Sequence, residues 1–209
     1  MSQILYLQAS PRRERSSSIA VADAFVGAYK QKHPDDQVSA INLFDHGMLH
    51  FDGNALQGKY NILQGRAYTA EEKAAWRQVE AEIETFTAAD KYVFAVPMWN
   101  FSIPYRLKQY IDIIVQPGYT FSFSPETGFS GLVTGKPAFV AYARGSAYPP
   151  GSEMAAMDMQ TPYMEKILGF MGFTDIRSVI VEPTLSDPEA MEKQLSGARE
   201  KARKMAETF

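Results

Sequence analysis

Short apolar segments alternate with amphipathic, helix-like segments along the whole chain. The strand-like segments cover residues 3–9, 37–43, 91–96, 136–143 and 176–182. Between them, apolar residues recur at intervals of three and four, which is the spacing of the buried face of a helix. Strands that alternate with helices form a mainly parallel sheet covered by helices on both faces. The alternation therefore predicts an α/β domain with five parallel strands.

Several helix ends can be located from single residues. Thr69 followed by Glu72 has the spacing of a capping box, which starts a helix. Asp187 followed by Pro188 suits an N-cap and a first helical turn. Gly172 is expected to end the helix that precedes the fifth strand.

Two connections are unusually long for this kind of fold, at residues 44–70 and 116–135. Connections of this length inside a compact domain are usually functional or contain small elements of their own. The chain shows no internal repeat and no linker, so we expect one domain over residues 1–209.

Composition and charge limit the partners of the chain. A net charge of −3 argues against a nucleic-acid partner, which usually needs a basic face. The absence of cysteine excludes disulfides and thiolate chemistry, and the three histidines have no zinc-motif spacing, so no metal site is expected. The chain opens without a signal-peptide pattern, and no apolar run approaches the roughly 18 residues of a membrane helix. We therefore expect a cytoplasmic protein without membrane contact.

Three loops are expected to meet at one edge of the sheet. In an open parallel sheet, ligands bind at the carboxyl ends of the strands, where the strand order reverses. With the strand order 2-1-3-4-5, strands one, three and four are neighbours. The segments that follow them are SPRRERSSS, PMWNFSIP and ARGSAYPPG. Their convergence marks the predicted ligand site.

The loop after the first strand is rich in hydroxyl groups. It lacks the G-x-G-x-x-G pattern of dinucleotide-binding proteins and instead offers Ser10, Ser16, Ser17 and Ser18. A helix N-terminus that follows such a loop presents free N–H groups, which suits a phosphate. Alternatively, these serines simply cap the helix. Their position after the first strand favours a monophosphate site.

The loop after the third strand combines aromatic and amide groups in Pro97, Met98, Trp99, Asn100 and Phe101. A flat aromatic cofactor beside the phosphate needs a wall and hydrogen bonds to its ring atoms, and this segment could supply both. The alternative is a structural turn whose aromatic side chains enter the core, because buried Trp and Phe are common.

The loop after the fourth strand offers Arg144, Gly145, Ser146 and Tyr148. Glycine permits close approach of the backbone to a ligand, and an arginine at the ring edge would stabilise negative charge on a reduced cofactor. The alternative is a solvated arginine in a turn.

These loops, with the segments LKQYIDIIVQPGYTFSF, GLVTGKPAFVAYARG and FMGF, resemble the FMN-dependent NADH-azoreductases among the flavodoxin-like NAD(P)H:quinone reductases. The resemblance implies a flavodoxin-like three-layer sandwich and a homodimer, with one FMN per subunit near the dimer interface. It implies FMN contacts from Ser10, Ser16, Ser17, Ser18, Pro97, Met98, Trp99, Asn100, Phe101, Ala143, Arg144, Gly145 and Ser146. Trp99 stands where relatives often have Tyr, and Ala143 and Ser146 depart from the usual Ser-Arg-Gly-Gly.

The resemblance also implies an activity. NADH or NADPH would reduce the flavin in a ping-pong mechanism, and a quinone or an azo compound would then take the electrons. Phe121, Phe123 and Tyr148 are candidate substrate contacts, and the two phenylalanines could act across the dimer, although ordinary interface packing also explains them. A flavodoxin-type electron carrier is the main alternative, and a module that has lost its flavin is another. The long loops and the nearly balanced 24 acidic and 21 basic residues favour the enzyme.

Overall fold

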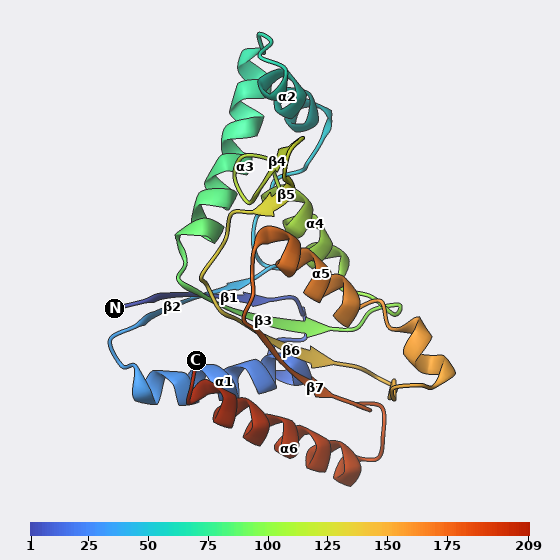
Figure 1. Cartoon of the computed structure of the whole chain (residues 1–209). Helices are drawn as coiled ribbons and strands as arrows, with labels where there is room; N and C mark the ends of the chain where they lie inside the picture. The colour runs from blue at the N-terminus through green and yellow to red at the C-terminus, as the bar shows by residue number, and fades with distance from the viewer.

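A five-stranded sheet lies between two layers of helices in the computed structural model, which describes residues 1–209 except the side chain of Leu63 (Figure 1). All neighbouring strands of this sheet are parallel. The sheet order is β2-β1-β3-β6-β7. Its strands are β1 (Gln3–Gln8), β2 (Gln37–Asn42), β3 (Lys91–Pro97), β6 (Ala138–Ala143) and β7 (Ile176–Val181).

The helices divide between the two faces of the sheet (Figure 1). One face carries α1 (Ser17–Lys32) and α6 (Pro188–Ala206), and the other carries α3 (Ala70–Ala88), α4 (Tyr105–Ile114) and α5 (Thr161–Met171). Strand β1 shows why both faces are covered, because its successive side chains point to opposite sides. Ile4 and Tyr6 pack into the core beneath α1 and α6, whereas Leu5 and Leu7 pack into the core beneath α3 to α5.

The helix ends predicted from single residues are confirmed. Thr69 and Glu72 form both hydrogen bonds of a capping box at the start of α3. The side chain of Asp187 accepts a hydrogen bond from the N–H of Ala190 at the start of α6. Gly172 follows α5 with a φ of 111°, in the left-handed region that favours glycine.

The strand order 2-1-3-4-5 needs one correction, because it numbers only five strands. The connection after α4 contains a hairpin of β4 (Phe121–Ser124) and β5 (Gly128–Gly131), so the last two strands of the sheet are the sixth and seventh of the chain. Two strands of four residues give too short a pattern to be recognised from the sequence. The hairpin packs closely on the end of α5, where a Cβ atom on Gly131 would lie 2.2 Å from the backbone nitrogen of Gly172.

The other long connection contains a helix that the sequence did not indicate. This helix, α2 (Gly53–Leu63), packs against α3, and the side chain of Asp52 caps it. Short 3-10 turns also occur at η1 (Arg13–Arg15) and η2 (Glu153–Met157). Within the described part of the chain, no helix combines the length and the apolar character needed to cross a membrane.

Candidate functional site

The serine-rich loop places buried hydroxyl groups at the start of α1. Ser10, Ser16 and Ser18 are 1%, 3% and 0% exposed, and Ser17 is half-buried. The Oγ atoms of Ser16 and Ser18 lie 3.1 Å apart. Ser16 is the N-cap residue, yet its side chain makes no capping hydrogen bond. The Ser16 side chain therefore does not cap α1.

The backbone of this loop is held from the neighbouring strand. Asn42, the last residue of β2, donates its side-chain amide to the carbonyl of Ser10 at 3.0 Å. Arg13 has a φ of 50°, which is unusual for a residue other than glycine. Its ion pair with Asp45 joins two exposed side chains and contributes little. A hollow of about 350 Å³ opens beside the loop, between the ends of β1 and β2.

The loop after β3 contains a tight and strained turn. The backbone groups of Trp99 and Ser102 exchange two hydrogen bonds, of 2.9 and 3.0 Å, across Asn100 and Phe101. These two central residues have φ values of 47° and 69°. Positive φ is tolerated by Asn but is a clear outlier for a bulky residue such as Phe. Backbone strain of this kind clusters at ligand-binding and active sites.

The strained turn leaves backbone donors unused. The N–H of Met98 donates to the carbonyl of Ala143 at 2.7 Å, and the N–H of Trp99 closes the turn. The N–H groups of Asn100 and Phe101 donate to no acceptor among the described residues. Of the segment predicted to bind a ring, these two N–H groups are therefore the ones able to serve a ligand.

An aromatic cluster surrounds Trp99. The ring of Phe44, just after β2, lies 5.6 Å from that of Trp99, and the ring of Tyr105 lies 6.2 Å from it. Tyr105 and Phe101 are both exposed. The sequence interpretation missed Phe44 and Tyr105. Their signal was their position, because each stands at the carboxyl end of a strand or at the start of the helix that follows.

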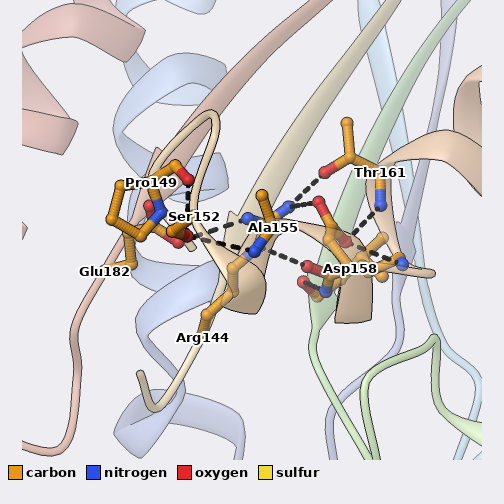
Figure 2. A network of polar contacts seen from close by, with 9 residues as sticks. Arg144, Pro149, Ser152, Ala155, Asp158, Thr161 and Glu182 are labelled. Atoms are coloured by element: carbon orange, nitrogen blue, oxygen red, sulfur yellow. Dashed lines mark hydrogen bonds and ion pairs between the residues drawn. The ribbon is translucent and has the colours of Figure 1, made fainter. Parts of the chain in front are cut away.

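The loop after β6 buries the side chain of its arginine. Arg144 is 3% exposed, so it is not the solvated arginine considered as an alternative. Its guanidinium group contacts side chains that precede α5 and follow β7 (Figure 2). Tyr148 lies over the guanidinium, 5.3 Å from it. Ala143 is buried, Gly145 packs against Leu185 and Ser146 is exposed. A role for Arg144 at the edge of a cofactor ring stays a prediction.

Phe121 and Phe123 lie on the β4–β5 hairpin, among the helices of the α3–α5 face rather than beside the strained turn (Figure 1). Their rings pack with Phe129 of β5, and Phe121 also contacts Phe170 of α5. Phe123 and Phe129 are 60% and 63% exposed. In a single subunit these rings therefore lie away from the candidate site.

In the part of the chain that the structure describes, the acidic side chains near the serine loop do not meet the requirements of a metal site. The described residues include no group of three or more His, Cys, Asp or Glu side chains that could hold a metal ion. Asp23 of α1 lines the hollow beside the serine loop, and burial raises the pKa of its carboxyl group. The Tyr6 hydroxyl donates to Asp23 at 2.9 Å, which ties this helix to β1.

Known proteins resemble this chain over its full length. A family model described as "Flavodoxin-like fold" matches residues 2–206. An FMN-dependent NADH:quinone oxidoreductase of Nitratidesulfovibrio vulgaris is 51% identical over 210 residues, covering 100% of both chains. One from Desulfotalea psychrophila is 45% identical, covering 99% of this chain and 97% of the relative.

Solved structures agree with these relatives. An azoreductase from Bacillus anthracis str. Sterne superposes with a TM-score of 0.91 at 31% identity, covering 100% of both chains. An FMN-dependent NADH-azoreductase from Bacillus anthracis str. Ames Ancestor, in complex with FMN, superposes with a TM-score of 0.84 at 27% identity, covering 99% of this chain and 100% of the other. The chain therefore belongs to the flavodoxin-like family, and within it to the FMN-dependent NADH:quinone oxidoreductases.

Proposed function

We propose that the protein is an FMN-dependent oxidoreductase that takes hydride from NADH or NADPH and passes the electrons to a quinone or an azo compound. The observation that carries this proposal is the meeting of two loops at one sheet edge. The backbone N–H of Ala9 donates to the carbonyl of Ala95 at 2.9 Å, so the serine loop and the strained turn leave adjacent strands side by side. One loop suits a phosphate and the other suits an aromatic ring, and FMN carries both groups.

The serine loop has the donors that a phosphate monoester needs. The hydroxyl groups of Ser10, Ser16 and Ser18 are buried, and Ser16 is not engaged in capping. The first N–H groups of a helix have no partner within the helix and lie at its positive end. These donors can bind an anion without a metal ion or a buried cation.

The strained turn has the donors that a flavin ring needs. The N–H groups of Asn100 and Phe101 are positioned by a turn that the backbone hydrogen bonds of Trp99 and Ser102 close. Fixed donors of this kind act strongly on charge that develops during a reaction, because they need no reorganisation. The side chains of Trp99, Phe44 and Tyr105 provide an apolar wall beside them.

When bound, FMN supplies the hydride and electron chemistry, while the protein binds, orients and shields the reacting groups. The chain's part is to anchor the phosphate, present N–H groups to the ring and exclude water with its aromatic side chains. We infer that the nicotinamide and the electron acceptor would occupy the same face of the flavin ring one after the other, which gives ping-pong kinetics. Cleavage of an azo bond takes four electrons and therefore two such rounds.

We further propose that the protein acts in the cytoplasm as a homodimer with FMN near the interface. The exposed rings of Phe123 and Phe129 support this proposal, because large exposed apolar groups gathered in one patch mark interaction sites. In the dimer, the hairpin of one subunit would then approach the FMN of the other.

The test begins with the purified protein, FMN and an excess of NADH under anaerobic conditions. We expect bound FMN to bleach fully, and to regain its absorbance when a quinone or an azo dye is added. A panel of quinones and azo dyes, run with NADH and with NADPH, identifies the preferred pair. Absence of FMN binding would contradict the proposal. Bound FMN that NADH does not reduce, or a persistent one-electron state, would instead favour the flavodoxin-type electron carrier.

A further inference from the structure

A buried polar network centred on Arg144 connects the ends of neighbouring strands (Figure 2). Arg144 comes directly after β6, and its guanidinium group donates hydrogen bonds to four side chains. The acceptors are Asp158 Oδ2 at 2.6 Å, Gln160 Oε1 at 3.0 Å, Glu182 Oε2 at 3.2 Å, and Thr161 Oγ1. Glu182 directly follows β7, and the other three acceptors lie where the chain enters α5.

Gln160 extends this network to β3. Its side chain is fully buried, and its Nε2 atom donates to the carbonyl of Val96 at 3.0 Å while its Oε1 atom accepts from Arg144. Guanidinium can only donate and a carbonyl can only accept, so this arrangement fixes which way the amide points. Arg144 therefore determines the orientation of the side chain that contacts the end of β3.

The segment before α5 also contacts the strained turn directly. The backbone N–H of Met159 donates to the carbonyl of Phe101 at 2.9 Å. Asp158 fixes the backbone around Met159, because its Oδ1 atom accepts from the N–H groups of Gln160 and Thr161 at 2.9 and 3.2 Å. Its other carboxylate oxygen is the one that Arg144 binds. The guanidinium group thus orders the segment that holds Phe101.

The turn needs such support from outside. Asn100 and Phe101 both have positive φ, and backbone strain of this kind persists only when the surrounding structure over-determines it. The two hydrogen bonds within the turn are local, whereas the contacts from Met159 and Gln160 come from about sixty residues further along the chain. The Met159 contact joins the turn itself to the segment before α5, and the Gln160 contact joins the strand that leads into the turn to the same segment.

We propose that Arg144 is a positioning residue that holds the Trp99–Ser102 turn in its strained conformation, acting through Gln160 and the segment 158–160. The proposal deepens the function proposed above, because the turn is the part assigned there to the flavin ring. Lysine keeps the positive charge at this position but cannot reproduce the forked geometry that binds several acceptors at once.

The test uses Trp99 as a reporter of the turn in the protein without FMN. The chain has two tryptophans, so a Trp76→Phe background leaves Trp99 as the single one. In that background we expect Arg144→Lys to raise the acrylamide quenching of Trp99 about twofold and the Kd for FMN about tenfold. The reason is that lysine cannot bind several acceptors at once as the planar guanidinium group does. FMN binding is measured by the quenching of flavin fluorescence, and folding is checked by far-UV circular dichroism.

A second variant keeps the test decisive if Arg144→Lys does not fold. Gln160→Leu leaves the ion pairs of Arg144 with Asp158 and Glu182 in place and removes the connection to Val96. We expect it to change Trp99 quenching and FMN affinity in the same direction, by a smaller factor.

The matched control is Arg177→Lys, which also disrupts an arginine fork. Arg177 donates to both carboxylate oxygens of Asp175 near the opposite end of β7, away from the turn. We expect it to lower the melting temperature while leaving Trp99 quenching and the FMN Kd unchanged. If Arg144→Lys or Gln160→Leu behaves like this control, Arg144 only stabilises the fold and the proposal is wrong. If the wild-type protein binds no FMN, the proposed function fails, and the Trp99 quenching still decides whether Arg144 positions the turn.

Discussion

In the loop after β1, the hydroxyl groups of Ser16 and Ser18 contact each other, and the Ser16 side chain leaves its helix uncapped. In the loop after β6, the guanidinium group of Arg144 is bound on all sides by partners within the protein. Both loops leave the same edge of the sheet, and these three polar side chains are buried. The Ser16 and Ser18 hydroxyl groups bond only within their own short segment, whereas the guanidinium group of Arg144 joins the ends of different strands.

The difference shows that the polar composition of a loop does not by itself indicate a ligand site. A buried polar group needs a hydrogen-bond partner. Where the protein supplies every partner, as around Arg144, the group has a structural task. Where the protein leaves the partner out, as in the N–H groups of Asn100 and Phe101, a ligand or water can provide it. Substitutions in the two kinds of loop should therefore have different consequences.

The largest effect is expected from a negative charge in the serine loop. Asp is a good N-cap and suits the positive end of α1, so Ser16→Asp should leave the melting temperature of the FMN-free protein unchanged or raise it. The same carboxylate would repel a phosphate, and we expect the Kd for FMN to rise at least about 100-fold, equivalent to about 2.7 kcal/mol. Ser16→Asn is the matched neutral control. Equal FMN affinity for the Asp and Asn variants would show that the FMN phosphate does not bind in this loop.

A smaller effect is expected at the strained turn, where Asn100 combines a positive φ with an exposed side chain. Asn100→Ala removes the amide and also places an unsuitable residue in the left-handed region, which costs roughly 1–2 kcal/mol. Asn100→Gly removes the amide without this strain. We expect Ala to weaken FMN binding about tenfold and Gly about threefold, as measured by flavin fluorescence titration. Unchanged affinity and turnover in both variants would exclude Asn100 from the site.

The sequence alone located the framework on which these loops stand. Strands β1, β3 and β6 are buried apolar runs, and the capping residues Thr69, Asp187 and Gly172 are local signals that act within a few residues. The hairpin β4–β5 was missed because its strands are short and its burial depends on α5. The placement of the serine loop beside the strained turn followed from the rule that ligands bind at the carboxyl ends of parallel strands.

The partners of Arg144 could not be predicted in the same way. Asp158 and Glu182 lie 14 and 38 residues away along the chain, and only the packing of α5 and β7 brings them to the guanidinium group. A single arginine in a glycine-containing loop looks the same whether its partner is a cofactor or a buried carboxylate. The positive φ of Phe101 was equally hidden, since no sequence pattern favours Phe in that conformation.

A modest change in acceptor preference is expected from Trp99→Tyr. The ring of Trp99 contacts Phe44 and Tyr105, so it contributes to the wall beside the strained turn. A smaller ring would widen the space next to that wall, where one extra group in an apolar pocket is worth roughly 1–3 kcal/mol. We expect kcat/KM for bulky quinones to rise several-fold relative to small ones, with a smaller change in the FMN Kd because Tyr keeps an aromatic ring in the wall. If the ratio of variant to wild-type kcat/KM is the same for small and bulky quinones, the acceptor binds away from Trp99.

The smallest effect on the site is expected from Asp36, which lies at the far end of α1 from the serine loop. The Tyr29 hydroxyl donates to its carboxylate at 2.6 Å, as does the backbone N–H of Ser2, and these bonds lower the pKa of Asp36 below its usual range. Because the folded-state pKa is lowered, the carboxylate stabilises the fold above the unfolded pKa of about 3.9, and this contribution is lost as the pH falls through the folded value. Asp36→Asn should therefore lower the melting temperature at pH 7, and the difference from wild type should shrink toward pH 3.

The same variant separates stability from ligand binding along one helix. Because Asp36 stands at one end of α1 and the serines at the other, we expect Asp36→Asn to leave the FMN Kd within about twofold of wild type at pH 7, a change of less than about 0.5 kcal/mol. Thermal unfolding followed by circular dichroism at several pH values, paired with flavin titration, measures both quantities. A large loss of FMN affinity in Asp36→Asn would mean that the serine loop responds to strain transmitted through α1, and that its donors depend on the scaffold as those of Arg144 do.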